Sequence, residues 1–205
     1  MLETPPKTSP ELSIESVQRL SINQYHAMVD AGIFSPADQV ELLQGWVIKK
    51  MPKKPSHNAI TGIIFDFILA LLPVGWFVDM EGPISTSDSE PEPNIAVIKG
   101  KRIDYIERHP NGEEVGIVIE IADSSLLRDQ TTKRLIYAAA NIPTYWVVNL
   151  RDQQIELYSN PINGNNPDYG SKQTFQFDQA CPIHIDEKKI GDLTLSEHLN
   201  QYPTE

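Results

Sequence analysis

The sequence predicts an α/β protein in which helices flank a mixed β-sheet. Two segments, residues 56–72 and 126–140, carry apolar residues at helical spacing. Short apolar runs of strand length lie between them and after the second one. This order of helix, strands, helix and strands favours helices packed against one sheet. A chain of 205 residues fits one core, because single cores commonly extend to about 250 residues.

The first expected elements are an arm, a short helix and a hairpin. Residues 1–12 are rich in proline and show little periodicity, which predicts a flexible arm before a single domain at residues 13–205. Ser21 is a suitable N-cap for a helix over residues 23–31. Residues 40–51 have the pattern of a β-hairpin with a glycine-containing turn.

The expected strands are short apolar runs bounded by turn residues. They cover residues 76–80, 95–98, 115–121, 145–149, 154–158 and 174–177. Asn141 and Pro143 are suited to end the second long helix. Residues 160–170 are rich in Asn, Pro and Gly and are expected to form a polar loop.

Composition excludes several classes of protein. Cys181 is the only cysteine, and the five histidines show no metal-ligand spacing, so no disulfide within the chain and no cysteine-built zinc site is expected. No apolar run reaches the roughly 18 residues of a membrane span, and residues 1–10 do not resemble a secretion signal, so we expect a cytoplasmic protein. The formal net charge of −11 disfavours a protein that coats nucleic acid non-specifically, because basic residues supply that affinity.

Glu120 is the most informative position for function. It interrupts residues 115–122, a run that is apolar on both faces and therefore typical of a central strand. A buried carboxylate without a partner is costly, so Glu120 should have a cation, a metal or a proton beside it. A glutamate that reaches solvent at the strand end is equally compatible with this run.

Lys133 lies four residues after Asp129 and four before Tyr137, so the three side chains share one helix face. The helix directly follows the Glu120 strand, so this face can approach the C-terminal end of that strand. Taken alone, the pattern is more typical of a surface ion pair and a core tyrosine. In residues 91–98, prolines lead into a strand on which Glu92 and Asn94 share one face.

Together with Glu41 and His57, these segments resemble the Uma family of restriction-endonuclease-like proteins, within the PD-(D/E)XK superfamily. The resemblance runs from about residue 20 to about residue 158. It is sharpest at residues 118–133, which read VIEIADSSLLRDQTTK, and continues through residues 137–146. It implies a restriction-endonuclease-like mixed sheet flanked by helices. The implied activity is metal-dependent hydrolysis of phosphodiester bonds, with DNA as substrate and one or two Mg²⁺ or Mn²⁺ ions as cofactor.

The resemblance also implies the site residues. The first metal-binding acid of the superfamily falls on Asn94 and the second on Glu120, while the lysine is displaced onto the following helix at Lys133. Glu41 and His57 match recurrent positions near the site, and Asp129 and Tyr137 are accessory candidates on the helix. A two-fold homodimer is expected as well, because a duplex presents two antiparallel strands.

Asn94 departs from the family pattern, because it offers a neutral oxygen where the family has a carboxylate. Glu92 can replace the lost charge only if the chain bends at Pro93. Without a metal, Lys133 is expected to pair with Glu120 as an internal counter-ion. Two hypotheses therefore stand: an endonuclease weakened at Asn94, and a non-catalytic relative that keeps the fold to bind nucleic acid or a protein.

Overall fold

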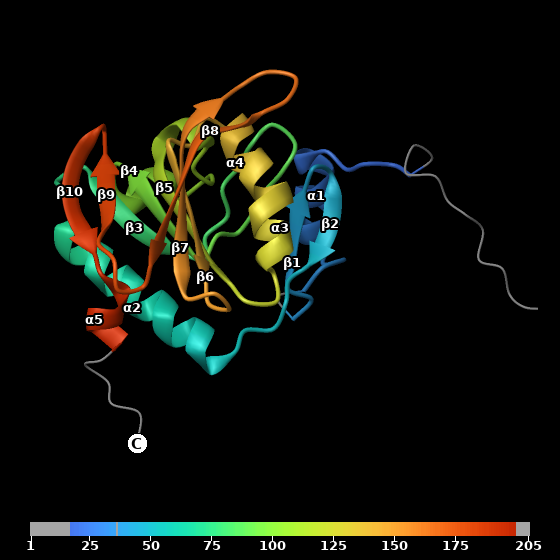
Figure 1. Ribbon diagram of the computed structural model, residues 1–205. Coiled ribbons are helices and arrows are strands. Elements are labelled where there is room, and N and C mark those ends of the chain that lie inside the picture. The colour runs from blue at the N-terminus through green and yellow to red at the C-terminus, as the bar shows by residue number, and fades with distance from the viewer. Residues whose placement is uncertain (1–16, 36, 200–205) are drawn as a thin grey trace, which may run out of the picture.

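The computed structural model describes residues 17–35 and 37–199, so the predicted arm at residues 1–12 lies outside the described residues. A six-stranded mixed sheet forms the centre, in the order β3-β4-β5-β6-β7-β8 (Figure 1). Strands β5 and β6 pair in parallel and all other neighbours pair antiparallel. The strands are β3 (Trp76–Met80), β4 (Ile95–Lys99), β5 (Val115–Ala122), β6 (Thr144–Asn149), β7 (Gln154–Ile162) and β8 (Asp168–Gln176). The predicted fold class is confirmed.

Each face of the sheet has its own apolar core. On one face, α2 (Pro55–Leu71) packs its buried isoleucines against β4 and β5. On the other face, Tyr137 and Ala138 of α4 (Arg134–Ala139) pack against Ala96 and Val118. Alternation along the strands places Asn94 and Glu120 on this second face, together with those two residues. Helices therefore cover both faces, as the sequence predicts.

The predicted helix over residues 126–140 is interrupted. It consists of α3 (Leu126–Arg128), a π-helical turn η4 (Asp129–Lys133) and α4. Such π-helical turns are rare in proteins, and those that occur are often found at functional sites. Both ends of this one, Asp129 and Lys133, are buried polar residues. The expectation of one regular helix is therefore wrong at the turn that carries the candidate site residues.

Before the sheet, α1 (Ile22–Asp30) begins at the predicted cap, where Ser21 and Gln24 form a reciprocal capping box. The predicted hairpin follows as β1 (Val40–Leu43) and β2 (Trp46–Lys49). It turns through Gln44 and Gly45 with φ values of 50° and 79°, the positive pair that a tight hairpin turn requires. Figure 1 shows this hairpin beside α3 and α4, away from α2's face of the sheet.

The C-terminal part contains more structure than predicted. Strands β7 and β8 leave only residues 163–167 as the polar loop, in place of 160–170. A second hairpin, β9 (Cys181–Ile185) and β10 (Lys188–Leu193), and the short helix α5 (Leu195–Leu199) were not predicted. Every second residue of β9 is buried, and this alternation was the available signal. Across the described residues, no helix is long and apolar enough to cross a membrane.

Candidate active site

A pocket opens beside the C-terminal end of β5. It is formed by that strand, the π-helical turn, the first turn of α2, the β1–β2 hairpin and the segment before β4. Seven of the eight predicted site residues line it, and Tyr137 lies beneath. The seven are Glu41, His57, Glu92, Asn94, Glu120, Asp129 and Lys133. Residues more than 90 positions apart in the chain therefore meet in one place.

Glu120 and Lys133 form a buried ion pair at the floor of the pocket. The Lys133 ammonium donates to the Glu120 carboxylate at 2.8 Å, and the Tyr137 hydroxyl donates to the same oxygen at 2.8 Å. Glu120 is 4% exposed and Lys133 is 5% exposed. The interpretations of Glu120 as a glutamate that reaches solvent and of Lys133 as a surface residue are therefore both wrong. The expected contact of Lys133 with Glu120 as its counter-ion is present.

Glu41 supplies a second carboxylate to the same ammonium. Its Oε2 lies 3.0 Å from Nζ of Lys133 and accepts a hydrogen bond from the main-chain N–H of Glu92 at 3.2 Å. Arg128 approaches the other oxygen at 3.8 Å. Lys133 therefore bridges the central sheet and the β1–β2 hairpin through two carboxylates.

Asn94 stands opposite Glu120. Ile95 pairs with Ile119 in the antiparallel register of β4 and β5, and Asn94 continues this register by one residue. Its side-chain oxygen accepts a hydrogen bond from the main-chain N–H of Ile121 at 2.8 Å. The reversed amide would set its NH₂ group against that N–H, so the hydrogen bond fixes the orientation. The remaining branch of the amide is then a nitrogen, which cannot bind a cation.

Glu92 lies in the same pocket, but its carboxylate pairs with Lys50. This carboxylate therefore already has a cationic partner, and the expected replacement of the missing acid by Glu92 would require it to leave Lys50. His57 is also buried, and burial, together with the charge of Lys53, lowers its pKa. It is therefore neutral at neutral pH, and its contribution to the pocket is that of an uncharged imidazole.

Burial is the largest influence on the pKa values of Glu120 and Asp129. Burial raises the pKa of Glu120, and the ammonium of Lys133 opposes this rise. Asp129, which accepts a hydrogen bond from Ser125 at 2.6 Å, has its pKa raised to about 7 by burial and by the charge of Glu120. Tyr137 keeps its proton, because burial and then Glu120 raise its pKa well above the ordinary value.

The carboxyl groups around Lys133 are of the type that a hard divalent cation uses, but in the described part of the chain their oxygens do not all lie within 4.8 Å of one another. Three carboxyl groups, from Glu41, Glu120 and Asp129, surround a single buried ammonium. Burial alone would lower the pKa of Lys133, but these carboxylates outweigh it and raise the pKa above its usual value. Lys133 and Arg128, which lies 3.8 Å from Glu41, are cationic partners of these groups, and carboxylate oxygens are the ligands that Mg²⁺ prefers.

Asp129 makes stability depend on pH. Its folded pKa of about 7 lies above the ordinary value of 3.8, so the folded state holds the proton more tightly. The contribution of Asp129 to the free energy of unfolding should therefore be largest below about pH 4 and should be lost as the pH rises to about 7. Urea denaturation across this range should show the fall in the metal-free protein. Asp129→Asn should remove this dependence of stability on pH, whereas Asp178→Asn, at an exposed position, should keep it. If stability falls as steeply with pH in Asp129→Asn as in the native chain, Asp129 is not the group responsible.

Sequence reasoning missed the basic residues at the pocket mouth. Lys50, Lys53, Lys54 and Arg128 line the pocket around the carboxylates. A visible signal was the run at residues 49–54, which reads KKMPKK. Each of the three pocket-lining lysines from this run pairs with an acid: Lys50 with Glu92, Lys53 with Glu81 and Lys54 with Asp123.

The fold and the sequence both match known proteins. Residues 22–184, more than half of the chain, match the Uma2 family model, described as "Putative restriction endonuclease". Among solved structures, the chain is similar to one described as a putative nuclease belonging to DUF820 from Anabaena variabilis. The TM-score is 0.63 at 15% identity, and the match covers 88% of this chain and 99% of that chain. A search of curated proteins found no match.

Proposed function

This chain belongs to the Uma2 family, and from that membership we propose that it is a metal-dependent endonuclease that hydrolyses phosphodiester bonds in DNA. The observation that carries the proposal is the buried Glu120–Lys133 pair, which is held by Tyr137 and faces an open pocket. Burying a carboxylate and an ammonium is costly, and a purely apolar contact would often be as stable. A chemical role explains why both charges lie at a pocket floor.

Glu120, with Glu41 and Asp129, would hold a Mg²⁺ or Mn²⁺ ion. When bound, such an ion stabilises charge on the phosphodiester and lowers the pKa of its water. Lys133 keeps its proton and supplies an ammonium that orients the attacking water or neutralises developing negative charge. Tyr137 also keeps its proton and holds the Glu120 carboxylate in place.

The pocket mouth supports a nucleic-acid substrate. Lys53, Lys54 and Arg128 can approach phosphates on either side of the carboxylates. Lys54 is 68% exposed although it pairs with Asp123, and an exposed pair of this kind is worth little. It can therefore exchange its partner for a phosphate. A two-fold dimer would be the form that cuts both strands of a duplex.

A plasmid-nicking assay with Mg²⁺ or Mn²⁺ tests the activity. The native chain should convert supercoiled DNA to nicked or linear forms, and a chelator should stop the reaction. Glu120→Gln should lose this activity, because it removes the anionic oxygen that holds the metal. Exposed Glu113→Gln should cut like the native chain. Cleavage that persists in Glu120→Gln would refute the assigned site.

One specific observation favours the non-catalytic hypothesis. The oxygen of Asn94 is already bonded to Ile121, and Lys133 already bridges Glu41 and Glu120. The charged groups at the pocket floor thus have partners within the protein, and the pocket is one acid short of the family pattern. A non-catalytic relative should bind DNA without cutting it and should give no Mg²⁺ binding that depends on Glu120. Calorimetric titration with Mg²⁺ separates the two hypotheses.

A further inference from the structure

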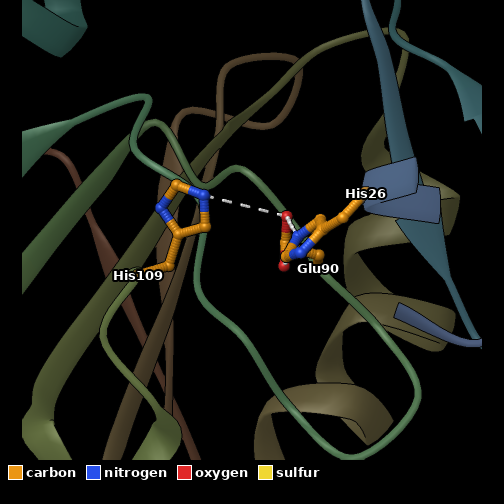
Figure 2. A group of neighbouring side chains, drawn as sticks. All are labelled: His26, Glu90 and His109. Atoms are coloured by element: carbon orange, nitrogen blue, oxygen red, sulfur yellow. Dashed lines mark hydrogen bonds and ion pairs between the residues drawn. The ribbon is translucent and has the colours of Figure 1, made fainter. Parts of the chain in front are cut away.

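A second group of ionisable side chains lies outside the candidate active site. His26 from α1, Glu90 from the loop between β3 and β4, and His109 from the segment before η3 (Gly112–Glu114) converge on one point (Figure 2). They line a second pocket that shares only Glu92 with the first among the described residues. The proposed nuclease chemistry uses none of these three residues.

The carboxylate of Glu90 is held in place from several directions. Its side chain is 5% exposed, and its main-chain N–H donates to Leu42 of β1 at 2.7 Å. The Ser85 hydroxyl donates to Oε2 at 3.0 Å. A ligand that is buried and hydrogen-bonded in this way is preorganised for a metal, because outer hydrogen bonds orient ligating carboxylates.

The two histidines approach this carboxylate from the solvent side. His26 Nε2 lies 2.8 Å from Oε2 of Glu90, and His109 Nε2 lies 3.9 Å from Oε1. The three ligand atoms all lie within 4.8 Å of one another. Donors in a tetrahedral zinc site are about 3.3–3.6 Å apart, from bond lengths near 2.0–2.2 Å. Small rotations of two half-exposed rings therefore reach that geometry.

The charges around the group also favour a cation. Asp30 and Glu107 line the same pocket, as does Glu92, whose carboxylate pairs with Lys50. The one arginine among the lining residues, Arg108, is engaged by Glu114 through two hydrogen bonds of 2.7 and 2.6 Å. The surroundings of Glu90 are therefore acidic, apart from histidines that can ligate as neutral imidazoles.

We propose that His26, Glu90 and His109 form a second metal site, which binds Zn²⁺ or a similar transition-metal ion with solvent as the remaining ligand. Two imidazoles and one carboxylate with an open position are a donor set that zinc uses. Mg²⁺ prefers oxygen ligands throughout. The two pockets therefore select different ions, and the second does not depend on the proposed nuclease activity.

The ion would join three segments that are distant in sequence. The loop that carries Glu90 continues to Glu92 and Asn94 in the first pocket. A parallel bridge between Ser85 and Asn111 already connects this loop to the segment of His109. Zinc at this site would add a bond to α1 and hold the loop against it. Stability should therefore rise with zinc, because the ion binds the folded arrangement and not the unfolded chain.

To test the proposal, the full chain is first dialysed against a chelator, and its binding of zinc is then measured. Calorimetry should give one Zn²⁺ per chain, and Co²⁺ should give the visible absorption of a low-coordinate site with nitrogen ligands. His26→Ala and His109→Ala should each weaken binding by about tenfold or more and remove the zinc-dependent rise in Tm. Both side chains are about half exposed, so these variants should fold. His184→Ala, which removes a histidine elsewhere, should bind zinc like the native chain.

Glu120→Gln separates this site from the first pocket. It should leave zinc binding unchanged even if no nuclease activity is ever detected. Equal zinc affinity in the native chain and in the His26→Ala, His109→Ala double variant would overturn the proposal. Loss of zinc in Glu120→Gln but not in the double variant would do the same, because it would place the ion in the first pocket.

Discussion

Asn94→Asp is expected to raise the affinity for Mg²⁺ by about tenfold or more, which corresponds to about 1.4 kcal/mol. One oxygen of the new carboxylate can keep the hydrogen bond from the Ile121 N–H. The other then replaces the amide nitrogen and faces the pocket as an anionic ligand opposite Glu120. If the other groups are intact, metal-dependent cleavage should appear or increase. The metal-free variant should be less stable, because another carboxylate adds repulsion in a largely buried pocket.

Calorimetry and plasmid nicking, both with Mg²⁺, measure this effect. Mg²⁺ is the better probe than zinc here, because it disfavours the histidine ligands of the second group. Asn23→Asp is the matched control, since it adds the same charge on exposed α1. If Asn94→Asp gains neither Mg²⁺ affinity nor cleavage, the pocket has lost more than one ligand and the non-catalytic hypothesis holds.

The main positions of the candidate site were predicted from the family resemblance, because the local pattern alone left Glu120 open and favoured a surface ion pair for Lys133. The continuous apolar run around Glu120 indicated a buried central strand, and β5 is buried along its whole length. The helix directly follows that strand, so its inner face, which carries Lys133 and Tyr137, can approach the C-terminal end of the strand. The spacing of four residues put both on one side, and both donate to Glu120.

Other features depend on contacts that a single sequence does not encode locally. The orientation of Asn94 depends on the main-chain N–H of Ile121, which the strand register brings within reach. The π-helical turn Asp129–Lys133 also has no specific signal, because residue type does not distinguish a π-helical turn from an α-helical one. The group around Glu90 joins positions 26, 90 and 109, so no spacing rule for metal ligands applies to it.

Lys133→Met is expected to destabilise the metal-free protein by about 3–5 kcal/mol, the usual cost of removing one partner from a buried ion pair. The substitution keeps most of the side-chain volume but removes the ammonium from Glu120 and leaves Glu41 with only Arg128, at 3.8 Å. Lys189→Met is the matched control. Its ion pair with Asp192 is about half exposed, and such pairs contribute less than about 1 kcal/mol.

The same variant shows whether a metal can replace the ammonium. If the three carboxyl groups are the metal ligands, saturating Mg²⁺ should restore part of the stability lost in Lys133→Met, because an ion that binds only the folded state stabilises it. The Lys189→Met control should respond to Mg²⁺ no more than the native chain does. Urea denaturation with and without Mg²⁺ measures both effects. With Asn94→Asp added, the chain should bind Mg²⁺ more tightly still and yet cut poorly, since Lys133 acts on the water and does not hold the ion. Unchanged stability of Lys133→Met without metal would mean that Glu41 or Glu120 takes up a proton in place of its cationic partner.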